Sequence, residues 1–311
     1  MDMRVLIVCS GNADGFVFEI NQAFVCEQMK AVSKCDESVI FDTFFLSSKG
    51  VRGYLNQLKL LKLKIEEFHP DLIHAHYGLS GLFANLQRQV PVVTTYHGSD
   101  INDKKSMAFS KISVLLSKHN VFVSSKLARK AKASRKCSII PCGVTMDDYP
   151  YVDKVEARKL MGIDACDRIV LFSSAFANVV KNAPLAKAAV EQLDGVKMIE
   201  LKGYNRGQVN LLLHAADVAL MTSFTEGSPQ FIKEAMAAGC PIVSVDVGDV
   251  KDVVGDTEGC FIAERDPKDI AVKIESAIEF GKRTNGRSKI ENYSNEVVAN
   301  KIVDIYKSIK K

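Results

Sequence analysis

The chain has 311 residues, of which 47% are hydrophobic and 25% charged, and its formal net charge is +4. This composition is that of an ordinary globular protein and argues against disorder, while the length suits two domains of about 150 residues each. No apolar run approaches the ~18 residues that a membrane-spanning helix needs, so an integral membrane protein is not expected. The first apolar run, VLIVCS, is followed by Gly11 and polar residues, which favours a buried strand over a signal peptide.

Short β-branched runs alternate with segments of helical periodicity along the first half of the chain. Strands that are apolar throughout, separated by helix-length connections, predict a parallel sheet covered on both faces, as in a doubly wound α/β domain. The expected strands are residues 5–10, 38–45, 71–76, 91–98, 120–125 and 137–141, and the expected helices are residues 16–32, 53–68, 78–87, a longer stretch ending at Lys118, and a basic helix after residue 125.

A stretch containing proline, glycine and aspartate, IIPCGVTMDDYPYVD, interrupts this alternation at residues 139–153 and predicts a domain boundary. A second series of the same kind follows it. We therefore expect a Rossmann-like domain over residues 1–145, another over 146–293, and a final helix over 294–311 that packs back toward the first domain. Ligands of such sheets bind outside the carboxyl ends of the strands, so both halves are expected to line a cleft. Neither half carries GxGxxG, which disfavours a dinucleotide dehydrogenase.

The eight cysteines show no CxxC or similar metal-ligand spacing, so no metal site is expected. Several of them lie inside apolar runs such as AGCPIV. These residues are expected to be reduced core cysteines of a cytoplasmic protein.

The segment TEGSPQFIKEAMAAGCP, residues 225–241, contains two glutamates on either side of a Gly-Ser-Pro step. Ser228 is a plausible N-cap and Pro229 a plausible first helical residue, so a helix should begin there and end near Gly239. The N-terminus of a helix offers free N–H groups to phosphate oxygens. Glu226 and Glu234 could then bind hydroxyl groups on either side of a diphosphate, although spacing alone also fits two ordinary helix charges.

This segment, within LMTSFTEGSPQFIKEAMAAGCPIV, resembles the donor-binding motif of the retaining glycosyltransferases of family 4 (GT4), which have the GT-B fold of two Rossmann-like domains facing a central cleft. The E-x7-E spacing of the family is present. DLIHAHYGLSG and PVVTTYHGSDIN look like first-domain motifs of the same family, IIPCGVTMDDY like its interdomain linker, and IVDIYKSI like its closing helix. The resemblance covers nearly the whole chain.

The resemblance implies separate roles for the residues of this motif. Glu234 should hold the nucleotide ribose and Glu226 the donor sugar. The residues between them, Gly227, Ser228 and Pro229, should place backbone groups near the diphosphate and the sugar.

Lys181, in FANVVKNAPLAK, resembles the lysine that binds the donor diphosphate, a task that requires positive charge. The sequence departs from the family pattern here. Many members carry an arginine a few residues earlier, where this chain has only Phe176, Ala177 and Asn178. Asn178 can supply a hydrogen bond at that position but no charge, and a solvated loop lysine remains the alternative for Lys181.

Further positions are carried over from the family motifs. His97 matches the histidine that contacts the donor sugar and its developing charge; a structural histidine at a strand end is the alternative. His74 and His76 lie on one face of an extended segment, where structural or acceptor-side roles are expected. Gly203 resembles the loop that passes the nucleotide base, and Gly15 the loop beneath the acceptor.

Positive charge is concentrated in the first domain. Residues 104–136 contain ten basic residues and no acidic one. Such a segment suits an anionic membrane surface or an anionic glycan, and nucleic acid is not expected because aromatic RNA-binding signatures are missing. A solvated basic face is the alternative to peripheral attachment at the inner face of the membrane.

Together these observations predict a retaining glycosyltransferase that moves a sugar from a UDP- or GDP-sugar to a glycan or lipid-linked acceptor in bacterial surface polysaccharide or glycoconjugate synthesis. The nucleotide sugar is a co-substrate, and no other cofactor is expected. The alternatives are a nucleotide-sugar epimerase or phosphorylase of the same fold, or a nucleotide-sugar-binding protein that has lost catalysis.

Overall fold

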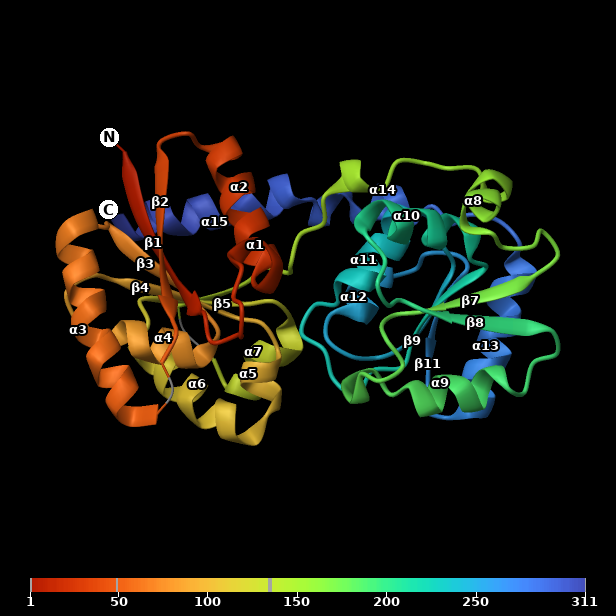
Figure 1. Cartoon of the computed structure of the whole chain (residues 1–311), viewed down its shortest axis with the longest axis horizontal. Helices are drawn as coiled ribbons and strands as arrows, with labels where there is room; N and C mark the ends of the chain where they lie inside the picture. Colours follow the sequence, from red (N-terminus) through yellow and green to blue (C-terminus); the bar gives the residue numbers. More distant parts are fainter. Residues whose placement is uncertain (1, 49, 134–135, 311) are drawn as a thin grey trace. The chain divides into compact units, whose positions relative to one another are not determined.

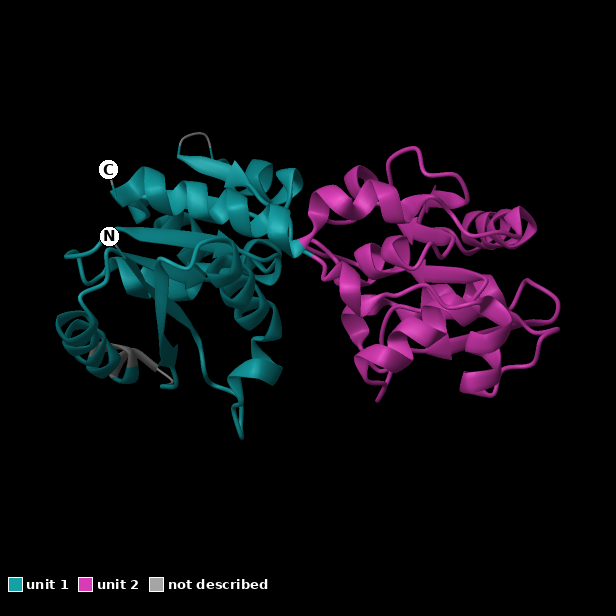
Figure 2. Ribbon diagram, turned by 90° about the horizontal axis from the view of Figure 1, so that it is seen from above, with its two compact units in different colours: residues 1–143, 295–311 teal, residues 144–294 magenta. Residues whose placement is uncertain are grey.

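The computed structural model describes residues 2–48, 50–133 and 136–310 and divides the chain into two compact units (Figures 1 and 2). Unit 1 comprises Met1–Gly143 and Asn295–Lys311, and unit 2 comprises Val144–Ser294. Each unit is a parallel sheet with helices on both faces (Figure 1). The α/β fold class expected from the alternating sequence pattern is confirmed.

Unit 1 contains a six-stranded sheet in the order β2-β1-β3-β4-β5-β6. Every residue of β3 and β4 is buried, as expected for central strands covered on both faces. The strand order reverses between β1 and β3, which is the switch point of a doubly wound sheet. The strands are β1 Met3–Ser10, β2 Val39–Leu46, β3 Leu72–His76, β4 Val92–Tyr96, β5 His119–Phe122 and β6 Cys137–Ile139; the helices are α1 Phe18–Asn21, α2 Ala23–Cys35, α3 Gly50–Phe68, α4 Gly78–Asn85, α5 Ser99–Asn102, α6 Lys104–Leu116, α7 Ser125–Ala131 and α15 Asn295–Lys310.

Unit 2 contains a five-stranded sheet in the order β11-β10-β9-β7-β8, and its order reverses between β7 and β9. The strands are β7 Arg168–Phe172, β8 Val196–Glu200, β9 Val218–Met221, β10 Ile242–Val245 and β11 Cys260–Ala263; the helices are η1 Met146–Asp148, α8 Lys154–Met161, η2 Val179–Lys181, α9 Ala183–Val190, α10 Arg206–Ala215, α11 Gln230–Ala237, α12 Val250–Val254, α13 Pro267–Phe280, α14 Gly286–Ile290 and η3 Glu291–Tyr293.

The last helix, α15, packs on unit 1, where it lies beside α2 (Figure 1). Its apolar face, which includes Ile302 and Tyr306, joins the core formed by β1 and α2. Ion pairs at its C-terminal end add to this attachment, with Lys307 at 2.7 Å from Asp36 and Lys310 at 2.9 Å from Asp71, just before β3. The final segment of the chain therefore completes the core of the first unit.

Helix α6 has an unusual distribution of side chains. Its buried positions include Ser110 and Ser113, which face glycines of α4: a Cβ atom at Gly78 would lie 1.9 Å from Oγ of Ser110, and one at Gly81 2.4 Å from Oγ of Ser113. Small residues on both helices allow this close approach. Four large apolar residues of α6 are exposed instead, namely Phe109, Ile112, Leu115 and Leu116, of which Leu115 is 84% exposed.

Two details differ from the sequence expectations. The long helix expected to end at Lys118 is divided into α5 and α6, because the Asp103 side chain accepts a hydrogen bond from Ser106 N at 2.8 Å and begins a new helix. All eight cysteines are free, but Cys166 is exposed, so the interpretation of every cysteine as a core residue is wrong for that one. Ser134 and Arg135, part of the basic segment, lie outside the described residues.

Candidate functional site

The candidate site of unit 2 is formed by loops that follow the carboxyl ends of β7, β9 and β10. In parallel sheets this edge is where ligands bind. The loop after β7 ends in η2, the loop after β9 leads into α11, and the loop after β10 leads into α12. The predicted donor-binding residues of the chain lie on the first two of these loops and on α11, with Gly203 on the loop after β8.

Lys181 and Glu226 are brought together by the loops after β7 and β9. The Lys181 ammonium lies 2.6 Å from Oε1 of Glu226, and the two side chains are only 21% and 14% exposed. The loops are also joined through their backbones, because Phe224 N donates to the Val180 carbonyl at 2.9 Å and the Thr222 hydroxyl donates to the Lys181 carbonyl at 3.0 Å. In the sequence these two charges are 45 positions apart, and the fold makes them an ion pair, hereafter the Lys181–Glu226 pair.

The start of α11 differs from the sequence prediction. The helix begins at Gln230 with Pro229 at the N-cap position, so Ser228 is not the N-cap and Pro229 is not the first helical residue. The Ser228 hydroxyl instead donates to Oδ2 of Asp249 at 2.5 Å. The Ser228 hydroxyl is therefore bonded to a buried carboxylate and does not cap the helix N-terminus. The predicted C-terminal end is confirmed, since α11 stops at Ala237 before Gly239, whose φ is +65°.

Glu234, on the second turn of α11, lies in a different environment from Glu226. Its carboxylate is hydrogen-bonded by the side chain of Tyr149 and interacts with the charge of Arg206. Burial raises the pKa of Glu234, and these two contacts partly offset the rise. Arg206 also pairs with Asp148 at 2.6 Å. The linker segment that the sequence suggested as a domain boundary therefore supplies side chains next to Glu234.

The remaining predicted positions of unit 2 are on exposed loops. Asn178 is exposed; its side-chain oxygen accepts from Val180 N at 3.2 Å, which caps η2, and its amide nitrogen donates to the Ser174 hydroxyl at 3.4 Å. Gly203 lies between β8 and α10 with a φ of +78°. A side chain would be strained in that conformation, which explains glycine at this position.

Several residues near these loops were not identified from the sequence. Arg265 lies over the Phe224 ring at 5.9 Å and donates to the Phe224 carbonyl at 2.9 Å, which adds a cation beside the loop after β9. Ser173 and Ser223 follow the ends of β7 and β9, and within the described part of the chain their buried hydroxyl groups have no hydrogen-bond partner. Lys233 is fully buried; a lysine within the apolar run FIKEAMAA was its only signal in the sequence.

Three histidines form a stacked cluster at the carboxyl ends of β3 and β4 in unit 1. The ring centroids of His74 and His76 are 4.4 Å apart, and those of His76 and His97 are 5.3 Å apart. Nδ1 of His76 shares a hydrogen bond with Nε2 of His97 at 3.0 Å, and His74 is bonded to Tyr306 of α15 and to Thr95. The prediction that His74 and His76 share one face of a strand is confirmed.

Burial lowers the pKa of each residue of this histidine cluster, to about 3 for His74 and His97 and well below the ordinary value for His76. All three rings are therefore neutral near pH 7. Each neutral ring has one donor and one acceptor nitrogen, so the hydrogen bond between His76 and His97 contains a single proton. No group of three or more His, Cys, Asp or Glu side chains among the described residues is arranged to hold a metal ion.

A buried carboxylate fixes the turn that carries His97. Asp100 accepts hydrogen bonds from the backbone N–H groups of Gly98 at 2.8 Å, Gly78 at 3.0 Å and His97 at 3.1 Å. Burial raises the pKa of Asp100 to about 6, and these three bonds limit the rise. Gly15, the other acceptor-side prediction, lies on the loop after β1 with a φ of +64°, and a Cβ atom added there would meet no described atom within 4 Å.

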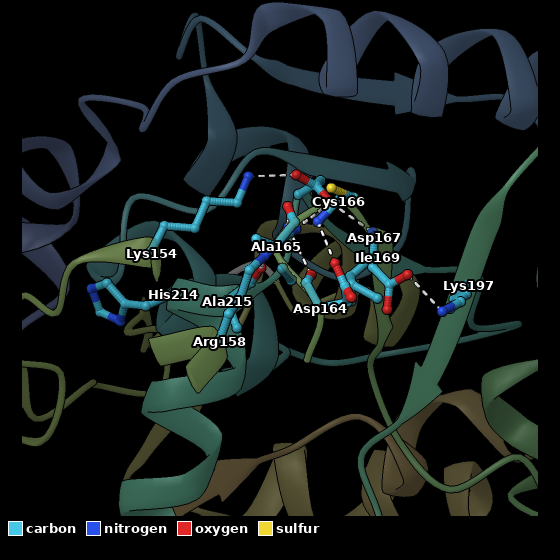
Figure 3. Close-up of polar contacts among 12 residues, drawn as sticks. Lys154, Arg158, Asp164, Ala165, Cys166, Asp167, Ile169, Lys197, His214 and Ala215 are labelled. Carbon is cyan, nitrogen blue, oxygen red and sulfur yellow. Dashed lines mark hydrogen bonds and ion pairs between the residues drawn. The ribbon is translucent and has the colours of Figure 1, made fainter. Parts of the chain in front are cut away.

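A second polar network of unit 2 lies at the opposite, amino edge of the sheet (Figure 3). Asp217, directly before β9, pairs with Lys154 at 2.5 Å and with the buried Arg158 at 2.9 Å. Arg158 also donates to the carbonyl groups of Ala165 and Ala215 (Figure 3). An open pocket adjoins Lys154 and Asp217. These charges already have partners, so the network ties α8 and α10 to the sheet.

Two family models match this chain in tandem. The model described as Glycosyltransferase Family 4 matches residues 3–148, and the model described as Glycosyl transferases group 1 matches residues 167–279. The first match lies in unit 1 apart from its last residues, and the second lies within unit 2.

A curated relative is the putative teichuronic acid biosynthesis glycosyltransferase TuaC of Bacillus subtilis, which is 26% identical over 245 residues. The match covers 69% of this chain and 63% of that protein, so the chain spans less than two thirds of the relative's length.

Solved structures resemble the whole chain in fold. A sucrose-phosphate synthase from Thermosynechococcus elongatus superimposes with a TM-score of 0.81 at 17% identity, covering 99% of both chains. HepE of Anabaena in complex with UDP superimposes with a TM-score of 0.78 at 15% identity, covering 98% of this chain and 100% of HepE. At these identities the likeness establishes the fold.

Proposed function

Because the chain belongs to glycosyltransferase family 4, we propose that it transfers a sugar from a nucleotide-sugar donor to a glycan or lipid-linked acceptor. The observation that carries the proposal is the Lys181–Glu226 pair beside the N-terminus of α11. That arrangement offers a cation and the backbone N–H groups of a helix N-terminus to a diphosphate, and a carboxylate to sugar hydroxyl groups. The name of the Bacillus subtilis relative supports a role in bacterial surface polysaccharide or glycoconjugate synthesis.

The donor is a UDP- or GDP-sugar in this proposal. An ammonium group has three donor hydrogens, so Lys181 can keep a hydrogen bond to Glu226 while it binds a phosphate oxygen. Glu226 then accepts a hydrogen bond from the donor sugar, and Gly227, Ser228 and Pro229 place the helix N-terminus near the diphosphate. The HepE complexes with UDP and with UDP-glucose support the nucleotide-sugar class of ligand.

Glu234 binds the ribose hydroxyl groups in the same proposal. The carboxylate is partly buried and already accepts a hydrogen bond from Tyr149, which fixes its orientation. Carboxylates have about four acceptor positions, so the contact to Tyr149 leaves capacity for a ribose. Gly203 would lie close to the nucleotide base, because a residue without a side chain lets the base approach the backbone.

The proposed chemistry retains the anomeric configuration. The bond between the anomeric carbon and the departing phosphate oxygen breaks while the acceptor oxygen adds to the same face, and the departing phosphate oxygen takes the acceptor proton. Lys181 and the helix N-terminus stabilise the charge that develops on the diphosphate, so the proposal needs neither a resident cofactor nor a metal ion. His97, which is neutral, contacts the donor sugar as a hydrogen-bonding group, and His76 fixes its ring.

A nucleotide-sugar screen tests this function directly. Ligand binding to the folded state raises the melting temperature, so a UDP- or GDP-sugar should do so while an ADP-sugar should not. Glu226→Ala and His97→Ala should then reduce release of nucleoside diphosphate in the presence of an acceptor extract. Unchanged rates in both variants would contradict the site assignment.

The alternatives make different predictions in the same assay. A transferase releases nucleoside diphosphate only when an acceptor is present. An epimerase interconverts the sugar without an acceptor, a phosphorylase requires inorganic phosphate, and a binding protein without catalysis shows a thermal shift but no turnover.

We also propose that unit 1 attaches to an anionic membrane surface through α6 and the basic segment at residues 104–136. The outward face of α6 combines Phe109, Ile112 and Leu115 with lysines at residues 104, 105 and 111, which is the composition of a helix that lies in a membrane interface. None of the described helices is long and apolar enough to cross a bilayer. Peripheral attachment at the cytoplasmic leaflet would bring a lipid-linked acceptor to the enzyme.

Vesicle sedimentation tests the attachment. Vesicles of phosphatidylglycerol and phosphatidylcholine should bind the chain, whereas pure phosphatidylcholine should bind it much less. Phe109→Ser with Leu115→Ser should reduce binding several-fold, and Leu160→Ser, at an exposed leucine of unit 2, should not. Equal binding to both kinds of vesicle would count against the proposal.

A further inference from the structure

Lys233, on the first turn of α11, has a side chain that is 0% exposed. Lysine is almost never fully buried unless it is paired. Its ammonium lies 2.5 Å from Oγ of Ser228 and 3.4 Å from Oδ2 of Asp249, and Ser228 Oγ donates to the same carboxylate oxygen at 2.5 Å. An ammonium, a hydroxyl and a carboxylate thus form a buried cluster, hereafter the Lys233 clamp.

The Lys233 clamp joins three segments of unit 2. Ser228 belongs to the loop before α11, Lys233 to the helix itself, and Asp249 to the loop after β10, directly before α12. The same two loops touch through their backbones, because a Cβ atom at Gly248 would lie 2.6 Å from the Gly227 carbonyl oxygen and 3.3 Å from Cβ of Glu226. The loop after β10 therefore supports the loop that carries Glu226.

Residues 226–229 connect the Lys181–Glu226 pair to the start of α11. Gly227 has no side chain and is the most flexible residue type, and Ser228 does not cap α11. The Lys181–Glu226 pair holds the loop from the β7 side, and in the proposed function both of its members gain hydrogen bonds to the ligand when the donor binds. A support that does not contact the ligand keeps its geometry through such a change.

We propose that Lys233 and Asp249 are positioning residues for residues 226–229, and that the Ser228 hydroxyl belongs to this support instead of contacting the donor. The diphosphate is then bound by backbone N–H groups at the start of α11 and by Lys181. This inference rests on the proposed nucleotide-sugar site but concerns residues that do not touch the ligand. A buried charged cluster specifies one loop geometry, because each partner left alone would be an unpaired buried charge.

Two variants and a matched control test the clamp. Lys233→Met removes the ammonium and keeps a side chain of similar length, but it leaves the Asp249 carboxylate buried without its cation. Lys233→Met with Asp249→Asn removes both charges and keeps an acceptor for Ser228, so it can fold even if the single variant does not. Lys251→Met, at an exposed lysine of α12, makes the same substitution outside the clamp.

Amide hydrogen exchange of residues 224–230 is the first measurement, and it needs no ligand. We expect exchange at least about tenfold faster in the double variant than in the wild-type chain, with no change in Lys251→Met and little change in β9 and β10. If residues 224–230 of the double variant exchanged at the same rate as in the wild-type chain, the proposal would be overturned.

Calorimetric binding of UDP and GDP, measured well below the melting temperature of every variant, is the second measurement. The double variant should bind at least about tenfold more weakly than Lys251→Met although both are folded. Equal binding by the double variant and the wild-type chain would overturn the positioning role. A wild-type chain that binds neither nucleotide would instead overturn the proposed function, and the exchange experiment would still decide whether the clamp holds the loop.

Discussion

Polar side chains gather at the carboxyl edge of the sheet in both units, but they are neutral histidines in unit 1 and paired charged residues in unit 2. At the carboxyl edge of unit 1, burial lowers the pKa of every member of the histidine cluster, so the buried rings are neutral. The carboxyl edge of unit 2 instead carries ion pairs, which are the Lys181–Glu226 pair and the contact of Lys233 with Asp249 in the Lys233 clamp. The same strand-loop-helix plan therefore supports two kinds of polar site.

The difference follows from the side chains available at each edge. Histidine can lose its charge near pH 7 at little cost, so burial simply keeps it neutral. When lysine and glutamate are buried, pairing and hydrogen bonds offset part of the desolvation penalty. In the proposed function, the cations of unit 2 bind the anionic diphosphate, whereas the neutral rings of unit 1 bind uncharged hydroxyl groups.

The largest expected effect is loss of the cation in unit 2. Lys181→Met should lower kcat/KM by about 100-fold, because it removes the charge that, in the proposed function, stabilises the departing diphosphate. Lys187→Met, at an exposed lysine of the neighbouring α9, serves as the control. Steady-state release of nucleoside diphosphate measures both, and an effect below about threefold in Lys181→Met would place the diphosphate elsewhere.

A smaller loss is expected at the neutral edge of unit 1. His97→Asn keeps a hydrogen-bonding group but changes its position, and we expect kcat to fall by about tenfold with little change in nucleotide affinity. His69→Asn, at an exposed histidine, should leave both unchanged. If His97→Asn weakened UDP or GDP binding as strongly as Lys181→Met, the division of roles between the two edges would be wrong.

Acid should destabilise the protein through the histidine cluster. Burial lowers the pKa of each ring, so below about pH 6.5 the unfolded chain binds protons that the folded chain does not. The free energy of unfolding is therefore highest above that pH and falls by about 1.4 kcal/mol per pH unit for each histidine as the pH decreases. Asp100, whose pKa burial raises to about 6, acts in the opposite direction, as do Glu234 and Asp249, whose pKa values burial also raises.

Urea unfolding between about pH 7 and pH 5 measures this dependence. His76→Asn should reduce the slope of the unfolding free energy against pH by the contribution of one histidine, about 1.4 kcal/mol per pH unit. This holds whatever the substitution does to the unfolding free energy at pH 7. His69→Asn is the control. An unchanged slope in His76→Asn would show that this ring is not held neutral.

The smallest effect concerns the position where the family has an arginine. Asn178→Ala should weaken nucleotide binding by less than about threefold, because the side chain is exposed and caps η2. Asn178→Arg should tighten binding by a similar factor, since it restores a charge. Calorimetric titration with UDP and GDP measures both, and a large loss in Asn178→Ala would make this residue a principal contact.

Much of the fold follows from local pattern. The apolar runs at residues 71–76 and 91–98 predicted the buried strands β3 and β4, and Gly239 marked the end of α11, because strand burial and helix termination depend on nearby residues. The HAH spacing also placed His74 and His76 on one face. The start of α11 could not be predicted, because a carboxylate from another loop takes the Ser228 hydroxyl.

The sequence by itself determined two series of parallel strands, the segment with Glu226 and Glu234, and the resemblance to a glycosyltransferase family. Only the tertiary structure paired Lys181 with Glu226, buried Lys233 against Asp249, and stacked His97 on His76. The physical reason is that strands and helices are specified by neighbouring residues, whereas the charge state and orientation of a polar side chain depend on burial and on partners that arrive from distant segments.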